Sequence, residues 1–255
     1  MPPKVTLMSH TPDPLKIIAC AAKLCYSASS IDEIMNNIND ERAIGLVEML
    51  SQIGHESPIE HISFTFGIEG ISRATLAQIT RHRIASYSVQ SQRYVEEGNF
   101  QFVIPPEIEQ IDKAKQEFLL AMQEAQKHYE SLTNLLFEKH YEELIKNGSD
   151  KKTAKTGAHK KAIEDARFVL PNACDTKLIL TMNARSLQNF FSHRLCNRAQ
   201  WEIRGLAEQM LKLVNNISPI LFINSRPPCV MGKCSEGKLS CGKILEVREK
   251  YKINA

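Results

Sequence analysis

Apolar and polar residues alternate along residues 61–69, a pattern typical of a β-strand with one buried face. The apolar positions recur at every second residue and are Ile62, Phe64, Phe66 and Ile68. We predict that Gly70 ends this strand, because glycine interrupts strand patterns. Two further apolar runs, at residues 5–8 and 176–182, predict shorter strands.

Helical spacing of apolar residues, together with capping residues, predicts helices over much of the remaining chain. The predicted helices span residues 14–25, 40–53, 72–83, 107–146, 184–193 and 198–216. Asp13, Asn39 and Asn183 precede three of these helices and are suited to cap their first turns. The segment 107–146 contains no Gly or Pro and therefore predicts one long helix or a helix pair.

Strands and helices mix along the chain without a regular βαβ alternation, which favours an α+β fold. We expect a single large domain with an antiparallel or mixed sheet flanked by long helices. This domain is predicted to span residues 1–225. The tail that follows, residues 226–255, contains cysteines and a stretch rich in Gly, Pro and Ser, so it is expected to be irregular.

The composition acts mainly by excluding classes of protein. With 43% hydrophobic and 24% charged residues, the chain of 255 residues is neither disordered nor collagen-like. No apolar run approaches the roughly 20 residues needed to cross a bilayer, and the N-terminus lacks a signal peptide, so we expect a cytoplasmic protein with no membrane partner. A net charge of +3 is too small to indicate a nucleic-acid-binding protein. We interpret the lysine-rich stretch that follows residue 150 as the solvated face of a helix. Its lysines are Lys151, Lys152, Lys155, Lys160 and Lys161.

Residues with useful chemistry concentrate between positions 81 and 94, where three Arg, one His and three Ser fall within fourteen residues. Arginine presents a planar fork of donors that matches phosphate oxygens, and serine hydroxyls complete such a site. The segment therefore indicates a site for a phosphorylated ligand. From composition alone, a surface loop with ordinary salt bridges stays open as the alternative. A second segment, residues 183–194, places Arg185 and Asn189 four residues apart on one helical face.

Several separated segments together resemble the flavin-dependent thymidylate synthases. The first is R-H-R followed after seven residues by S, which runs from Arg81 to Ser91. Upstream, HESPIEH at residues 55–61 and the strand after it are similar to a second block of the family. Downstream, Arg167, the segment 183–189, Arg194 and the segment 199–203 resemble the remaining blocks in the same order. The resemblance covers residues 5 to 225.

The resemblance implies an enzyme that methylates dUMP at C5 to give dTMP. It implies methylenetetrahydrofolate as the carbon donor, FAD as the hydride carrier and NADPH as the reductant of the flavin. The family further implies an α/β homotetramer whose active sites are built at subunit interfaces.

Functional residues follow from the resemblance position by position. FAD is expected to contact Ser57, Arg81, His82, Arg83, Val89, Asn183, Arg185 and Asn189. The substrate dUMP is expected to contact Gln78, Arg81, Val89, Gln90, Ser91, Gln92, Arg93, Arg167 and Arg194. Arg93 and Arg167 suit its phosphate. Arg194 resembles the catalytic residue at the uracil ring, where a permanent cation stabilises negative charge as the ring is activated.

Two positions depart from the family pattern. Some members have Glu or Gln where this chain has Val89, so any side-chain hydrogen bond there is lost or replaced by a backbone contact. Ser88 stands where others have Asn. The contacts around Val89 therefore stay open, although neither departure changes the inferred reaction.

A nucleophilic cysteine is the first alternative, since the other class of thymidylate synthase attacks dUMP with a thiolate. Cys174 precedes a predicted strand and is expected to be a buried, inert thiol. Cys196 is flanked by Arg194 and Arg198, and cations lower the pKa of a thiol. Ser91 has no evident base, and the pKa of His82 should be lowered by its arginine neighbours.

Metal binding and RNA binding are two further alternatives. Cys229, Cys234 and Cys241 are separated by four and six residues, which is not C-x-x-C spacing, and a fourth ligand would have to come from elsewhere. We therefore assign no metal site from the sequence. RNA binding through the arginine and lysine segments is disfavoured because aromatic residues make up only 7% of the chain and no stacking motif is present.

Overall fold

The computed structural model describes residues 3–94 and 100–251 of the chain. These residues form two compact units. The larger unit comprises residues 3–69, 77–88 and 178–251, and the smaller unit comprises residues 70–76, 89–94 and 100–177.

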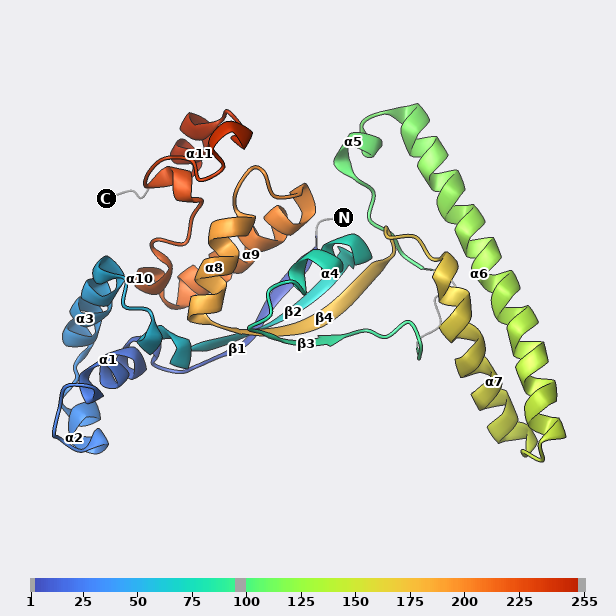
Figure 1. The fold of residues 1–255 in the computed structure, drawn as a ribbon, viewed down its shortest axis with the longest axis horizontal. Coiled ribbons are helices and arrows are strands. Elements are labelled where there is room, and N and C mark those ends of the chain that lie inside the picture. Colours follow the sequence, from blue (N-terminus) through green and yellow to red (C-terminus); the bar gives the residue numbers. More distant parts are fainter. Residues whose placement is uncertain (1–2, 95–99, 252–255) are drawn as a thin grey trace. The chain divides into compact units, whose positions relative to one another are not determined.

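A four-stranded antiparallel sheet forms the β part of the fold, with the strand order β1-β2-β4-β3 (Figure 1). Its strands are β1 (Lys4–His10), β2 (Ser63–Ser72), β3 (Ser86–Val89) and β4 (Asp175–Asn183). In the pairing of β1 with β2, Val5 lies opposite Ile68 and Leu7 lies opposite Phe66. The alternation predicted for β2 is confirmed, because its inward-facing side chains Phe64, Phe66 and Ile68 are fully buried.

Two features of the strands differ from the sequence prediction. Gly70 does not end β2, which continues to Ser72. Its φ of 73° lies in the left-handed region, which glycine adopts without strain, so the strand passes through this residue. The strand β3 was not predicted. Tyr87 and Val89 alternate with two serines in it, but the strand is only four residues long and its side chains are exposed or half-buried in turn.

The larger unit is mainly helical. Its helices are α1 (Pro14–Leu24), α2 (Ile31–Asn36), α3 (Asp40–Ile53), α8 (Ala184–Arg194), α9 (Trp201–Ile217), α10 (Pro219–Phe222) and α11 (Ile244–Lys250). Its 3₁₀ turns are η1 (Ser57–His61), η3 (Pro228–Val230) and η4 (Gly237–Leu239). A further helix, α4 (Arg73–Ile79), directly follows β2 and is shorter than the predicted 72–83.

Capping was predicted correctly for two helices and wrongly for one. The side-chain oxygen of Asn39 accepts a hydrogen bond from the Arg42 N–H at 3.0 Å, which caps α3. Asn183 caps α8 in the same way. Asp13, in contrast, makes no side-chain cap, because its φ of 46° places it in the left-handed region rather than the extended one that a capping residue uses.

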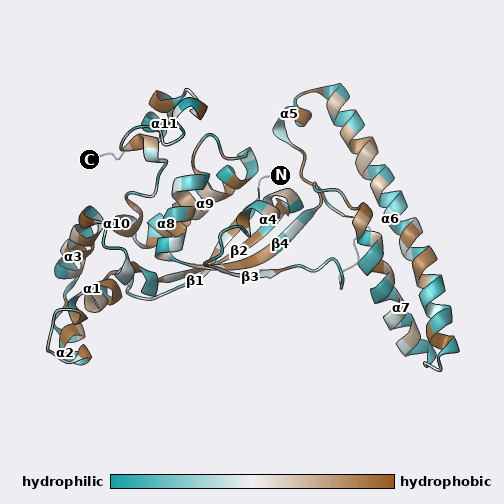
Figure 2. Ribbon diagram, viewed as in Figure 1, coloured by the Kyte–Doolittle hydropathy of each residue, from teal (hydrophilic) through white to brown (hydrophobic). Residues whose placement is uncertain are grey.

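The smaller unit contains a helical hairpin. The predicted segment 107–146 is a helix pair, α5 (Pro106–Glu109) and α6 (Asp112–Lys146), and α7 (Lys151–Ala166) packs beside α6 (Figure 1). A short turn, η2 (Arg167–Val169), follows α7. Small side chains on the buried face of α7 allow this close packing, and they are Ala154, Ala158, Ala162 and Ala166. The five lysines of α7 are exposed, as predicted, and Figure 2 shows the hydrophilic character of this helix.

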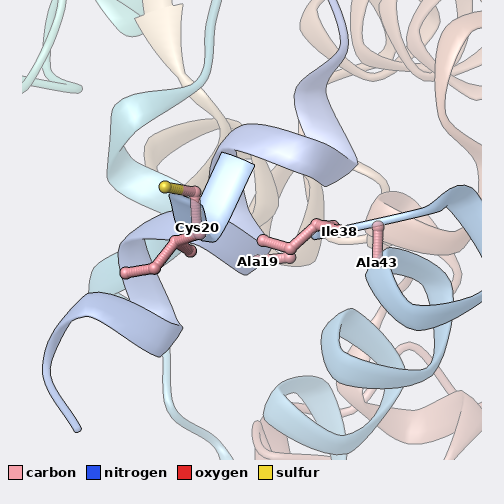
Figure 3. Close-up of a cluster of buried hydrophobic side chains, with 5 residues drawn as sticks. Ala19, Cys20, Ile38 and Ala43 are labelled. Carbon is pink, nitrogen blue, oxygen red and sulfur yellow. The ribbon is translucent and has the colours of Figure 1, made fainter. Parts of the chain in front are cut away.

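Two apolar clusters hold the larger unit together. One joins α1 to α3 and to the segment between α2 and α3 through Ala19, Cys20, Ile38 and Ala43 (Figure 3). The other is aromatic. In it the ring of Phe222 meets those of Phe64 and Phe191 edge to face, with centroids 5.4 and 5.9 Å apart. Because these rings come from α10, β2 and α8, they fix α8 against the sheet.

The predicted α+β fold with an antiparallel sheet and long helices is confirmed. The domain boundary near residue 225 stays a prediction, and α11 is an exception to the irregular tail expected there. Across residues 3–94 and 100–251, no helix combines the length and the apolar character that crossing a membrane requires.

Candidate functional site

A pocket of about 640 Å³ lies in the larger unit among α3, η1, α8 and α10. Its volume falls in the range of small-molecule sites. Three of the residues predicted to contact FAD line it, namely Asn183, Arg185 and Asn189. Apolar side chains complete the wall, including Val47, Leu50, Ile59, Ile84 and Leu221.

The first turn of α8 is held rigidly at this pocket. The Asn183 side chain accepts a hydrogen bond from the Ser186 N–H at 2.8 Å, and the Ala184 N–H donates to the Ile62 carbonyl at 2.7 Å. Leu187 and Phe190 on the opposite face are fully buried. The positive end of the helix dipole therefore lies at the pocket, where it favours an anionic or hydrogen-bond-accepting group.

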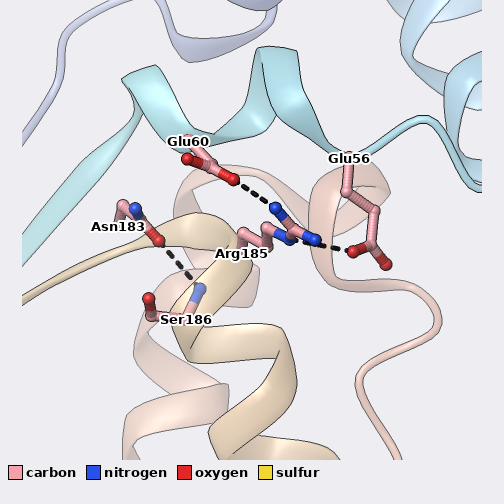
Figure 4. A network of polar contacts seen from close by, with 5 residues as sticks. All are labelled: Glu56, Glu60, Asn183, Arg185 and Ser186. Carbon is pink, nitrogen blue, oxygen red and sulfur yellow. Dashed lines mark hydrogen bonds and ion pairs between the residues drawn. The ribbon is translucent and has the colours of Figure 1, made fainter. Parts of the chain in front are cut away.

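Arg185 forms ion pairs with two carboxylates of the segment 55–61 (Figure 4). Its Nε donates to Glu56 at 3.0 Å, and its Nη1 donates to Glu60. The hydrogen bond and charge of Glu60, followed by those of Glu56, raise the pKa of Arg185. These two bonds use two of the five N–H donors of the guanidinium, so the others can face a ligand.

Arg194, the predicted catalytic residue, is hydrogen-bonded to His82 of the R-H-R segment. The Nε of Arg194 donates to Nε2 of His82 at 3.1 Å, which requires that this ring nitrogen carries no proton. Burial, then Arg194 and then His193, lower the pKa of His82 to about 4. The lowered pKa was predicted, but its causes differ from the expected effect of the two flanking arginines. Burial and the charge of Arg81 lower the pKa of Arg194.

Tyr87 fixes the turn that carries His82. Its hydroxyl lies 2.8 Å from the carbonyl oxygens of both Ile79 and His82, and it can donate its single proton to either one. Burial raises the pKa of Tyr87 to about 12, so the hydroxyl stays protonated at neutral pH. Within the same segment, Arg81 and Arg83 are exposed and available to a ligand.

Several predicted dUMP contacts lie in the smaller unit, and local bonds engage Gln90, Ser91 and Arg93 there. The Gln90 N–H donates to the Lys177 carbonyl at 3.0 Å, which holds the chain just after Val89. The Arg93 N–H donates to the Ser91 hydroxyl at 3.1 Å, and Arg93 Nε pairs with Glu164 at 2.8 Å. A phosphate at Arg93 must therefore compete with the Glu164 carboxylate.

The structure thus separates the predicted residues into groups. The larger unit contains Ser57, Gln78, Arg81, His82, Arg83, Asn183, Arg185, Asn189 and Arg194. The smaller unit contains Val89, Gln90, Ser91, Gln92, Arg93 and Arg167. Ser57 begins η1 but is not among the residues that line the pocket.

Sequence reasoning missed several residues of the pocket. Glu56 and Glu60 are the partners of Arg185. The available signal was that they are the two glutamates of the HESPIEH segment, four residues apart. Ile220 and Asn224 also line the pocket, and nothing local in the sequence pointed to them.

Cys174 matches its prediction as an inert thiol. It is fully buried in an apolar cluster with Phe100 and Met122. A thiolate is costly in such surroundings, so Cys174 is unsuited to act as a nucleophile. Cys196 is partly exposed.

The chain is similar over nearly its whole length to proteins of one family. A family model described as "Thymidylate synthase complementing protein" matches residues 6–220. A protein of Clostridium tetani named "Flavin-dependent thymidylate synthase" is 50% identical over 248 residues, covering 97% of this chain and 96% of the relative. Proteins of the same name from Geobacter sulfurreducens and Nitratidesulfovibrio vulgaris are 44% and 40% identical. They cover 98% and 94% of this chain, and the matches span 98% and 95% of the relatives.

Proposed function

The chain belongs to the family of thymidylate synthase complementing proteins, and on this premise we propose that it is a flavin-dependent thymidylate synthase that methylates dUMP to dTMP. The resemblance found in the sequence is confirmed by the family match. The observation that carries the proposal is the placement of residues on α8. Its first turns carry Asn183, Arg185 and Asn189 at a pocket, and its last residue is Arg194, bonded to His82.

FAD is the proposed cofactor, and the pocket at the start of α8 is its proposed site. The residues present fit it, because the unused donors of Arg185 and the positive end of α8 suit an anionic group. The apolar wall that includes Val47 and Leu50 suits a flat ring system. When bound and reduced, the flavin supplies the hydride for the reaction. Further contacts are proposed for Ser57, Arg81, His82, Arg83 and Val89.

Arg194 is proposed to stabilise the negative charge that develops on the uracil ring. His82 accepts a hydrogen bond only from Nε of Arg194, so the terminal N–H groups of the Arg194 guanidinium are left for the substrate. Because His82 stays neutral at pH 7, it accepts this bond without adding a second positive charge. His82 therefore orients Arg194, and preorganised donors of this kind lower the barrier to a step that develops negative charge.

The phosphate of dUMP is proposed to bind Arg93 and Arg167. The dUMP phosphate replaces the Glu164 carboxylate as the partner of Arg93, and it carries more negative charge and more acceptor oxygens than the carboxylate. The other proposed dUMP contacts are Gln78, Arg81, Val89, Gln90, Ser91 and Gln92.

Methylenetetrahydrofolate as carbon donor, NADPH as reductant, a cytoplasmic location and a homotetramer with shared active sites complete the proposal. Large apolar side chains on the surface of the smaller unit support assembly with other copies of the chain. Leu120, Leu135 and Phe168 are 56%, 62% and 81% exposed.

Steady-state kinetics on arginine variants tests this division of roles. We expect Arg93→Ala to remove one charge-assisted contact of about 1.5–3 kcal/mol and to weaken apparent dUMP affinity by about one to two powers of ten. Arg194→Ala should lower kcat even at saturating dUMP, and Arg194→Lys should rescue only part of the rate because it lacks the planar fork. Arg42→Ala, an exposed arginine on α3 outside the pocket lining, is the control. Full recovery of Arg194→Ala turnover at saturating dUMP would contradict the catalytic role.

A further inference from the structure

Four of the seven cysteines follow Arg194 in the chain, and none of them is among the residues proposed to contact FAD or dUMP. Cys196 is in the turn between α8 and α9, Cys229 is in η3, and Cys234 and Cys241 lie in turns on either side of η4. All four belong to the larger unit. Cys229 is buried and the other three are partly exposed.

Hydrogen bonds with α9 hold the turn of Cys196 and also the end of α11. Arg204 on α9 donates to the carbonyl oxygens of Asn197 and Ala199 at 3.1 and 3.3 Å. One turn further along α9, Glu208 accepts hydrogen bonds from Lys250 at 2.5 Å and from the Tyr251 hydroxyl at 3.3 Å. The turn of Cys196 and the end of α11 are thus fixed to adjacent turns of one helix.

Hydrogen bonds from α11 hold the turn of Cys229. Arg248 donates from Nε to the Cys229 carbonyl at 3.0 Å and from Nη2 to the Gly232 carbonyl at 2.8 Å. Since α11 is itself bonded to α9, the turns that carry Cys196 and Cys229 are held against the same pair of helices.

The thiols themselves are close enough to affect one another. Burial raises the pKa of the Cys229 thiol, and the charges of Cys196, Cys234 and Cys241 raise it further. Like charges act on a pKa in this way only when they are near. The three other thiols therefore lie in the neighbourhood of the buried Cys229 thiol.

The tail buries few apolar side chains. Among its described residues 226–251, the buried apolar side chains are those of Pro227, Cys229 and Val247. Segments with so small an apolar core usually depend on disulfides or a metal ion.

We propose that Cys196, Cys229, Cys234 and Cys241 are the four ligands of a structural zinc ion. Four thiolates are a common ligand set of closed, tetrahedral zinc sites, and soft thiolate ligands select this metal over magnesium or calcium. Cys196 supplies the fourth ligand that the spacing of the tail cysteines lacked. It comes from the turn before α9, so the ion joins the tail to the helical part of the larger unit.

Zinc binding requires a local rearrangement. Within the described part of the chain, no three His, Cys, Asp or Glu side chains are already placed as a group that could hold a metal ion. Cys234 and Cys241 lie in turns outside the α-helices, so they can move toward Cys229 without unwinding a helix. A cation among the thiolates also removes their mutual repulsion.

Metal analysis of the full-length protein, purified without chelators from zinc-supplemented cells, tests the proposal. We expect about one zinc per chain in the unmodified protein and in the control Cys25→Ser, whose thiol is exposed on the turn after α1. Cys196→Ser, Cys234→Ser and Cys241→Ser should each lose at least nine-tenths of the zinc while keeping their helical circular dichroism. If Cys229→Ser fails to fold, these three variants still decide the matter.

Four results would overturn the proposal. These are a folded protein without zinc, zinc that is retained in Cys196→Ser, iron with acid-labile sulfide in place of zinc, and disulfides between these cysteines in a thiol count. None of these measurements depends on thymidylate synthase activity, so the zinc site and the proposed function can fail separately.

Discussion

His82 makes the stability of this protein depend on pH in a direction that the structure determines. Its pKa falls from 6.5 to about 4 on folding, because burial and the neighbouring Arg194 disfavour the charged ring. Between these two values the unfolded chain binds a proton that the folded chain does not. The contribution of His82 is therefore fully present above pH 6.5 and is lost as the pH falls from 6.5 towards 4.

The size of this contribution follows from the shift. A shift of about 2.5 pKa units corresponds to about 3.4 kcal/mol at 1.36 kcal/mol per unit. The ring is only partly buried, so screening by solvent reduces the expected loss to about 1–2 kcal/mol. His82→Gln should abolish it, because the glutamine amide oxygen can accept the bond from Arg194 and does not titrate.

Urea unfolding at fixed protein concentration, at intervals between pH 7.5 and pH 4, measures the free energy of unfolding for both proteins. The control is His128→Gln, since His128 is exposed on α6 and should leave the pH dependence unchanged. Parallel loss of stability in the unmodified protein and in His82→Gln over this range would refute the reasoning.

Two further predictions concern the cap of α8 and the aromatic cluster that includes Phe64. Asn183→Ala should cost about 1 kcal/mol of stability by removing the cap of α8, and it should also weaken FAD binding in a fluorescence titration. The control Asn39→Ala removes the cap of α3 and should cost a similar amount of stability without affecting FAD binding. Equal effects of the two variants on FAD affinity would argue against the pocket. Phe64→Ala should lower the free energy of unfolding by about 3–5 kcal/mol, because this fully buried ring joins β2 to α10. A loss below 1 kcal/mol in urea unfolding would show that the aromatic cluster is not the core described.

Local patterns explain which parts of the fold could be predicted from the sequence. The period-two alternation of β2 and the capping of α3 by Asn39 depend on residues within a few positions of one another. The capping box of α2, in which Ser30 and Glu33 each bond the other's backbone N–H, was also visible locally but was not used. In contrast, the left-handed backbone of Asp13 overrides its capping preference, and nothing in its neighbours signals this.

The candidate site depends on contacts that no local pattern contains. His82 and Arg194 are 112 residues apart in the chain, and Glu56 and Arg185 are 129 residues apart. Resemblance to the family identified three of these four residues as ligand contacts, but only the folded chain shows that they are partners of one another. The hydrogen bonds that tie the turn of Cys196 and the end of α11 to α9 are also long-range contacts, and no local pattern indicates those of Lys250 and Tyr251 with Glu208.

Product analysis with the purified protein tests most directly whether this chain is a flavin-dependent thymidylate synthase. The protein is incubated without oxygen with FAD, NADPH, methylenetetrahydrofolate and dUMP, and the nucleotides are separated by chromatography. We expect dTMP to form at the expense of dUMP, to require each of the added components, and to be strongly reduced in Arg194→Ala. If folded, FAD-supplemented protein forms no dTMP under these conditions, the function proposed for the α8 pocket and Arg194 is wrong.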